Sequence, residues 1–315
     1  MLTAASEQFV ARVESDLQRL FPADGEGRLL QAARHLVFAG GRRMRVRLVA
    51  SCGAMTGAGE DDLAAIAAAT ELIHAASLLH DDVVDAGTLR RGRTTANVAF
   101  GSPAAVLSGD WVLAHAMLLL ERRPDVVFGA VRCVAEMSDA AIREIEGRGT
   151  LSRGLATWRD VAEGKTGALF GWAAQATAIC GVAAELAPGF ERFGRHLGVA
   201  FQLADDISDL VGSAGKDRFS DLRSGTPSYP VLLAAADDAG FAERVERLWQ
   251  APVADEADVQ ALGEMLLAAG ARERSLAKLD AELDAALASL GPGAAAFSEA
   301  FRSLAAVFVR PLAGA

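Results

Sequence analysis

The sequence predicts an all-α protein with a single domain. Alanine and leucine dominate the chain and tyrosine occurs once, a composition that favours helix over strand. Apolar residues recur at helical rather than alternating spacing over segments of roughly 15 to 25 residues. Glycine and proline interrupt these segments at Pro22–Gly27, Gly87–Pro103 and Gly212–Pro230, among other places, which divides the chain into about ten helices. Because no Ser/Gly-rich linker separates domains, we expect residues 1–315 to form one domain.

Three segments illustrate the helical pattern. Apolar positions recur at helical spacing near the N-terminus at Phe9, Val13, Leu17 and Leu20, so an amphipathic helix is expected there and not a signal peptide. Thr157 followed by Asp160 resembles a capping box and predicts the start of a helix. The alanine-rich segment 168–184 is interrupted by Gln175 and indicates a buried helix and not a membrane span. We therefore expect a cytoplasmic protein without stable membrane insertion.

The overall charge limits the class of partner. The formal net charge is -10, which argues against a general nucleic-acid or anionic-membrane surface. Three cysteines lie far apart with no C-x-x-C spacing, so neither a disulfide framework nor a zinc ribbon is indicated. Any binding of polyanions must come from local basic clusters.

Two acidic clusters each follow an apolar run. The first, in LLHDDVVDA (78–86), contains Asp81, Asp82 and Asp85, and the second, in QLADDISDL (202–210), contains Asp205, Asp206 and Asp209. Side chains four residues apart share one face of a helix, and two negative charges at that spacing destabilise the helix. The C-terminal end of a helix is also unfavourable for anions. A single cluster of this kind is usually solvated surface, but two clusters behind apolar helices indicate carboxylates that need a partner. Magnesium, which combines one or two carboxylates with water and phosphate oxygens, fits best.

Basic residues supply the complementary charge. They are Arg42 and Arg45 in GGRRMRVR (40–47), Arg90 and Arg91 after the first acidic cluster, and Lys165 and Lys216 nearer the second in sequence. Any one of them alone is more often solvated than functional. Together with metal-binding carboxylates, several separate basic groups indicate a site for two diphosphate groups. His74 lies seven residues before Asp81, and both a core histidine and a place at the site mouth stay open.

Four segments carry a family resemblance. They are GGRRMR (40–45), LLHDDVVDAGTLRRGRTTAN (78–97), EGKTGALF (163–170) and FQLADDISDLVGSAGKDRFSDL (201–222). In order and spacing, the chain resembles the trans (E-type) isoprenyl diphosphate synthases, the polyprenyl synthetase family. The resemblance implies a bundle of long antiparallel helices around a deep apolar cavity (the isoprenoid synthase type) and a homodimer. It also implies head-to-tail condensation of isopentenyl diphosphate with an allylic diphosphate.

The same resemblance implies a role for each site residue. About three Mg2+ ions, with Mn2+ as an alternative, would be held by Asp81, Asp82, Asp85, Asp205, Asp206 and Asp209. The allylic diphosphate would be bound by Arg90, Lys165, Thr166, Gln202 and Lys216. Isopentenyl diphosphate would be bound by Arg42, Arg45, His74 and Arg91. Among these, the residues expected to act in catalysis are Asp81, Asp85, Lys165 and Asp205.

The chain departs from the family pattern at three places. Arg42 stands where the family has lysine, residues 217–219 (Asp-Arg-Phe) replace a turn with proline and glycine, and Thr226 stands where a lysine is common. The last is a lost positive charge, so we expect somewhat weaker diphosphate binding.

Product length should depend on the residues before the first cluster. Helix geometry places Thr70, Ile73, Ala76 and Ser77 along the expected path of the growing chain. None is aromatic, which favours a medium- or long-chain product. Alternatives are a short-chain (farnesyl or geranylgeranyl) diphosphate synthase, a class I terpene cyclase, and a non-catalytic subunit of a heteromeric synthase.

Overall fold

The protein is almost entirely helical, as the composition predicts. The computed structural model describes residues 4–90, 92–181, 184–212, 218–291, 302 and 309, and this part of the chain contains fifteen α-helices and one two-stranded sheet. Arg91 and Lys216, two of the predicted diphosphate-binding residues, lie outside the described residues. The chain divides into two compact units: the first comprises Met1–Val134 and Trp172–Glu191, and the second comprises Ala135–Gly171 and Arg192–Ala315. The prediction of a single domain stays a prediction.

The elements of the first part of the chain are α1 (Ala4–Leu20), α2 (Arg28–Val37), α3 (Met44–Thr56), α4 (Glu60–Val84), β1 (Leu89–Arg90), β2 (Arg93–Thr94), α5 (Ala96–Phe100), α6 (Ser102–Leu119) and α7 (Pro124–Gly147). Those that follow are α8 (Gly154–Ala162), a π-helical turn (Glu163–Gly167), α9 (Ala168–Cys180), a 3-10 turn (Ala184–Leu186), α10 (Ala187–Val211), α11 (Ser220–Ser224), α12 (Tyr229–Asp237), α13 (Ala239–Gln250), α14 (Glu256–Ala268) and α15 (Ala271–Ser289).

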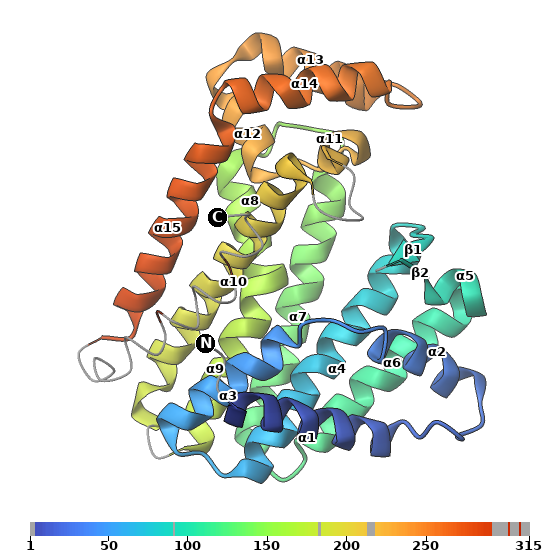
Figure 1. The fold of residues 1–315 in the computed structure, drawn as a ribbon, viewed down its shortest axis with the longest axis vertical. Coiled ribbons are helices and arrows are strands. Elements are labelled where there is room, and N and C mark those ends of the chain that lie inside the picture. The colour runs from blue at the N-terminus through green and yellow to red at the C-terminus, as the bar shows by residue number, and fades with distance from the viewer. Residues whose placement is uncertain are drawn as a thin grey trace. The chain divides into compact units, whose positions relative to one another are not determined.

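The first unit is built around α4. This helix is buried along most of its length, and α6 packs alongside it and runs in the opposite direction (Figure 1). The amphipathic first helix is confirmed, since Val13 and Leu17 of α1 are fully buried and α1 packs on α3 and α4. By length and composition α4 could cross a membrane, but 72% of its apolar window is buried inside the protein, as expected of a core helix.

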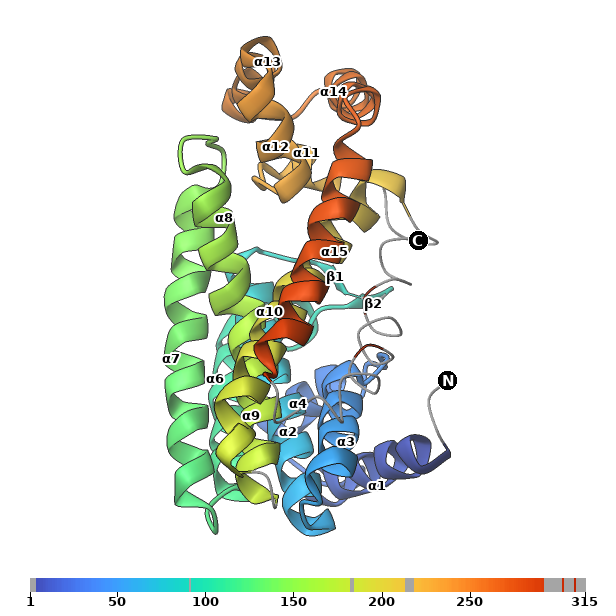
Figure 2. The same cartoon turned by 90° about the vertical axis from the view of Figure 1, so that its left-hand side faces the viewer.

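In the second unit, α8, the π-helical turn and the first residues of α9 (168–171) follow one another without a break, and the part of α10 from Arg192 onward packs closely against the π-helical turn. A Cβ on Gly198 would lie 2.5 Å from the Cα of Gly167, so this close approach of two backbones requires glycine. On the other side, α15 lies beside α10 (Figure 2), where Glu282 accepts a hydrogen bond from His196 at 2.8 Å.

The C-terminal helices of the second unit enclose a hydrophobic core of their own. Phe219 is fully buried in this core, and its ring occupies the place that a Cβ on Gly263 would fill. Thr157, which the sequence indicates at a helix start, instead lies inside α8, and its hydroxyl donates to the carbonyl of Arg153 at 2.8 Å. That prediction was wrong because Gly154, at φ 62°, begins the helix one turn earlier.

Candidate active site

The first aspartate cluster lies at the C-terminal end of α4. Asp81 and Asp82 belong to the last turn, and Asp85 caps the helix by donating its backbone N–H to the carbonyl of Asp81 at 2.8 Å. Asp81 is half-buried and Asp85 is exposed. The predicted geometry, with two carboxylates one turn apart at the end of an apolar helix, is therefore present.

Asp82 is buried and held by an arginine. The residue is 3% exposed, and its Oδ1 accepts from Nε and Nη2 of Arg90 at 2.9 and 2.8 Å. The short antiparallel pair β1–β2, in which Arg90 pairs with Arg93, brings Arg90 back toward the helix end. The second oxygen, Oδ2, is buried and has no hydrogen-bond partner among the described residues. A buried carboxylate oxygen without a donor is costly, which is consistent with a cation bound nearby.

Two arginines of the basic segment 40–47 form ion pairs that connect α3 to other helices. Arg43 forms ion pairs with Glu14 and Glu71 at 3.2 and 3.0 Å and so joins the start of α3 to α1 and α4. Arg47 contacts both carboxylate oxygens of Glu7, at 2.6 and 3.0 Å. Of the predicted substrate-binding residues in this segment, Arg42 is exposed, whereas Arg45 is half-buried, as Arg43 and Arg47 are.

The second aspartate cluster lies near the end of α10. Asp205 is exposed, whereas Asp206 and Asp209 are 5% and 3% exposed. Oδ2 of Asp206 accepts from the indole N–H of Trp158 and the backbone N–H of Tyr229, at 3.0 and 2.9 Å. Burial raises the pKa of Asp206 to about 7, although hydrogen bonds from Tyr229 and Gln202 oppose the rise.

Asp209 positions the segment that follows α10. Its Oδ1 accepts from the backbone N–H of Ser220 at 3.0 Å and from the Ser220 hydroxyl, and its Oδ2 accepts from the N–H of Asp221 at 3.2 Å. These donors open the short helix α11, so Asp209 acts as its cap. Phe219, one of the departures from the family pattern, adopts a left-handed φ of 60° and turns its ring into the C-terminal core.

A hydrogen-bonded chain joins the predicted substrate-binding residues of this unit. The Thr166 hydroxyl donates to Oε1 of Gln202 at 3.3 Å, and Nε2 of Gln202 donates to Oδ1 of Asp206 at 3.0 Å. Lys165 forms an ion pair with Glu144 of α7. Lys165 and Thr166 lie in the π-helical turn, a local departure from α-helix that is common at functional sites.

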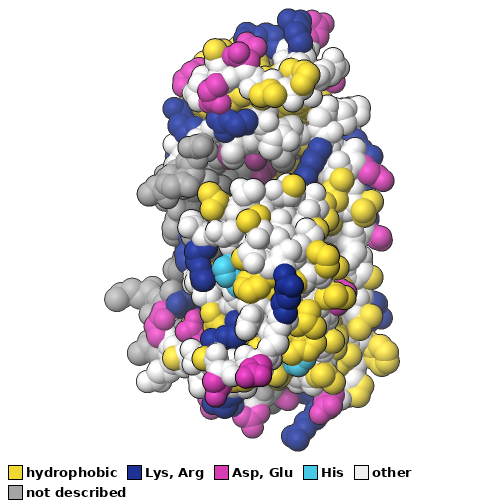
Figure 3. Space-filling view, turned by 90° about the vertical axis from the view of Figure 1, so that its right-hand side faces the viewer, with side chains coloured by type: hydrophobic (Ala, Val, Ile, Leu, Met, Phe, Trp, Pro, Cys, Tyr) yellow, Lys and Arg dark blue, Asp and Glu magenta, His cyan; other side chains and the backbone are white. Residues whose placement is uncertain are grey.

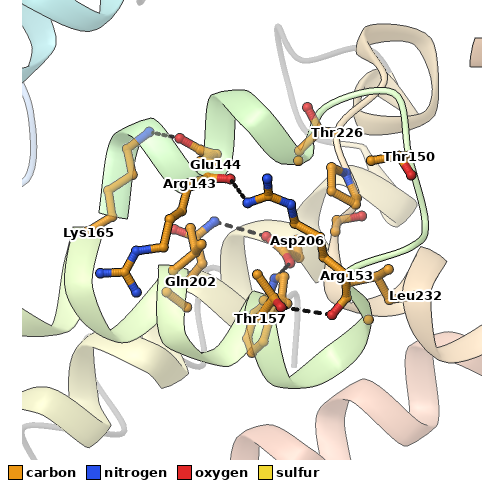
Figure 4. A pocket seen from close by; sticks show the side chains of 17 residues that line it. Arg143, Glu144, Thr150, Arg153, Thr157, Lys165, Gln202, Asp206, Thr226 and Leu232 are labelled. Atoms are coloured by element: carbon orange, nitrogen blue, oxygen red, sulfur yellow. Dashed lines mark hydrogen bonds and ion pairs between the residues drawn. The ribbon is translucent and has the colours of Figure 1, made fainter. Parts of the chain in front are cut away.

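One cavity in the second unit brings several of these residues together (Figure 4). Its wall includes Lys165, Gln202 and Asp206 from the predicted site and Thr226 from the loop before α12. Three residues predicted for the site therefore line one cavity, from positions up to 41 apart in the sequence.

Other residues at this site were not identified from the sequence. They are Trp158, Tyr229 and Glu144, named above, and Asp221, whose pKa is raised well above its usual range by burial and then by the charges of Asp206 and Asp209. Asp221 falls within the segment that carries the family resemblance and could have been found there. The other three follow no motif, and only the folded structure brings them to the carboxylate and the lysine.

No group of three or more His, Cys, Asp or Glu side chains in the described residues gathers as a metal site. Magnesium does not require such a group, because it binds through one or two carboxylates and completes its shell with water and phosphate oxygens. The donor set of each cluster, hard carboxylate oxygens behind an apolar helix, fits this ion.

The sequence and the fold place the chain among known proteins. A family model described as polyprenyl synthetase matches residues 26–266, so the chain belongs to the polyprenyl synthetase family, whose members are prenyltransferases.

Three curated relatives illustrate the family. The heptaprenyl diphosphate synthase component 2 of Geobacillus stearothermophilus is 33% identical over 288 residues, 88% of each chain. The nonaprenyl diphosphate synthase of Mycobacterium tuberculosis is 34% identical over 269 residues, 82% of this chain and 79% of that protein. A short chain isoprenyl diphosphate synthase from Methanothermobacter thermautotrophicus is 34% identical over 247 residues, 74% of each.

Among solved structures, a polyprenyl synthase from Caulobacter crescentus CB15, complexed with calcium and isoprenyl diphosphate, matches with a TM-score of 0.86 and 30% identity. The match covers 98% of this chain and 95% of that one. The predicted all-α isoprenoid synthase fold is thereby confirmed.

Proposed function

We propose that this protein condenses isopentenyl diphosphate with an allylic diphosphate, head to tail and with trans double-bond geometry, to make a medium- or long-chain polyprenyl diphosphate. Family membership and the heptaprenyl and nonaprenyl relatives support the reaction and the product class. The observation that carries the proposal is the chain of contacts from Thr166 through Gln202 to Asp206. It joins two of the segments that carry the family resemblance, 163–170 and 201–222, and Gln202 and Asp206 line the same cavity as Lys165.

The metal is part of this proposal. The carboxylates that would hold about three Mg2+ ions, or Mn2+ in their place, are those of the two clusters, with Asp81, Asp85 and Asp205 the more exposed members. Bound Mg2+ would supply Lewis-acid stabilisation of the diphosphate leaving group. Asp82 and Asp209 would support this arrangement indirectly, because Asp82 is engaged by Arg90 and Asp209 caps α11.

The remaining residues would bind and orient the substrates. Lys165 and Thr166 would donate to oxygens of the allylic diphosphate, with Lys165 exchanging Glu144 for the more highly charged ligand. Arg42, Arg45 and His74 of the first unit would bind isopentenyl diphosphate. No protein base is required, since the proton lost from the condensation product can pass to the released diphosphate. Apolar helices would keep water from the allylic cation.

Product length in this proposal depends on the side chains of α4 that precede the first aspartate cluster. Thr70, Ile73 and Ala76 are buried and Ser77 is half-buried on α4. None of these side chains is large enough to close a channel near the aspartates, which supports a medium or long product. The relatives include a short-chain synthase, so chromatography of the product has to decide between the two.

We further propose a homodimer in the cytoplasm. Large apolar side chains are exposed on α6 and α7 of the first unit, including Leu118 and Phe128, which is 67% exposed. Both also line an apolar groove between these helices. Figure 3 shows hydrophobic side chains at the surface along its right-hand edge. Exposed apolar surface of this kind favours a protein partner, and light scattering on the purified protein would give its oligomeric state.

The reaction is tested with the purified full chain, Mg2+, isopentenyl diphosphate and an allylic primer. Chain-elongated diphosphates are expected, and hydrocarbon release would instead favour a terpene cyclase. No turnover unless a second protein is added would favour a subunit of a heteromeric synthase. Asp81→Ala should reduce turnover by orders of magnitude, whereas Asp61→Ala, at an exposed position in the first turn of the same helix, should not.

A further inference from the structure

The cavity of the second unit has five charged residues on its wall, and four of them are already engaged. The five are Arg143, Glu144, Arg153, Lys165 and Asp206. Lys165 is paired with Glu144. Asp206 accepts three N–H donors. Arg153 is paired with Glu146 at 3.1 Å and also donates to the backbone carbonyl of Arg143 at 3.3 Å.

Arg143 is the exception. It lies in the penultimate turn of α7 and is exposed. Its guanidinium forms no hydrogen bond or ion pair with another described residue. Only its backbone carbonyl takes part in such a contact, by accepting from Arg153. Figure 4 shows the side chain extending away from Arg153, on the side of Lys165 and Gln202. The wall therefore offers one cation that no carboxylate of the described chain neutralises.

Thr226 lines the same cavity. This is the position where the family commonly has a lysine, and here it is a neutral hydroxyl 2.8 Å from that of Ser224. One cation expected on this wall is thus missing, and a different one, Arg143, is contributed to the wall by α7.

We infer that Arg143 binds the diphosphate of the allylic substrate and supplies the positive charge that Thr226 lacks. The inference rests on the proposed function for the identity of the ligand. A guanidinium presents a planar fork that can grip two phosphate oxygens at once. Because Arg143 has no carboxylate to give up, its binding to an incoming diphosphate does not compete with an internal ion pair.

The experiment measures binding of inorganic diphosphate, in the presence of Mg2+, to the full chain by titration calorimetry. Arg143→Gln should weaken binding about tenfold or more, with an unchanged urea unfolding midpoint because the residue is exposed. The matched control is Arg247→Gln, an exposed arginine on α13 outside the cavity, which should bind as the wild type does. Adding Thr226→Lys to Arg143→Gln should restore most of the lost affinity.

Unchanged diphosphate binding by Arg143→Gln would overturn the inference, and so would a loss that Thr226→Lys does not restore. In the elongation assay, Arg143→Gln alone should raise KM for the allylic primer far more than it lowers kcat. A wild-type chain that binds diphosphate through Arg143 but elongates no primer would contradict only the proposed function.

Discussion

The indole N–H of Trp158 donates to the buried carboxylate of Asp206 at 3.0 Å. Trp158 lies on α8 and Asp206 on α10, so the contact links the helix before the π-helical turn to the second aspartate cluster. The Trp158 ring also packs edge-on against Tyr229, with centroids 4.9 Å apart. Asp206 thus has a fixed orientation, set by Trp158, by the Tyr229 N–H and by Gln202.

Trp158→Phe should test this arrangement, because it keeps an aromatic ring and removes the donor. Leaving a buried carboxylate oxygen with one donor fewer should cost about 1–3 kcal/mol of unfolding free energy, measured by urea denaturation. We also expect a higher KM for the allylic substrate. Trp249→Phe is the control, since Trp249 donates to the carbonyl of Leu222 at 2.8 Å; it should lose stability without a change in KM. Equal KM values for the two variants would contradict a role of Trp158 at the site.

Much of the fold follows from local patterns in the sequence. The apolar stripe of α1 and the position of Asp81 and Asp85 at the end of α4 were both predictable, because helical periodicity and the next turn signal fix them. The number of helices was underestimated at about ten. Short helices such as α5 and α11, and the closely spaced set from α12 to α15, are separated by brief turns with weak sequence signals.

The site could be predicted only in part. The carboxylates, Lys165 and Gln202 carry motif signals, but the contacts that orient them do not. Glu144 reaches Lys165 across 21 positions of sequence, and Trp158 reaches Asp206 across 48. Contacts between residues so far apart in the sequence depend on how the helices pack, and neither residue type nor spacing predicts them.

Asp205 and Asp209 should behave differently although they belong to one motif. Asp205→Ala removes an exposed carboxylate, so we expect a stability change within about 0.5 kcal/mol and a loss of turnover of about 100-fold or more. Asp209→Ala removes the acceptor of three donors at the start of α11 and should cost about 1–3 kcal/mol of unfolding free energy. Urea unfolding and the elongation assay distinguish the two. Equal losses of stability would show that Asp209 does not hold α11.

Glu282 should make the stability of the second unit depend on pH. Burial opposes its ionisation, but hydrogen bonds from His196 and Lys278 and the charge of Arg159 prevail and lower its pKa from 4.5 to about 2. A lowered pKa stabilises the folded state above pH 4.5, and this contribution is lost as the pH falls toward 2. Glu282→Gln should therefore cost up to about 3 kcal/mol at pH 7, and the difference from wild type should shrink between pH 4.5 and 3.

The matched control for Glu282 is an exposed carboxylate whose pKa is also lowered. The pKa of Glu256 falls to about 2 because of hydrogen bonds from Arg223 and Gln260. Solvent and salt screen such a surface pair, so Glu256→Gln should leave the unfolding free energy almost unchanged at every pH. A constant difference between Glu282→Gln and wild type from pH 7 to pH 3 would contradict the role of the buried ion cluster.

Ser77→Phe should shorten the product. Ser77 lies one turn before Asp81 on α4, is half-buried, and donates to the carbonyl of His74 at 2.9 Å, so a ring there would extend along the face that carries Asp81. We expect the main product to lose at least one isoprene unit, read by reverse-phase chromatography of radiolabelled products. Ala65→Phe, at another small half-buried position of α4, controls for the strain of a larger side chain, which costs about 1–3 kcal/mol in a packed interior. Because both variants carry that strain, a change of product length confined to Ser77→Phe would assign the effect to the path of the growing chain. An active Ser77→Phe enzyme with the wild-type product would show that this face of α4 does not line the path.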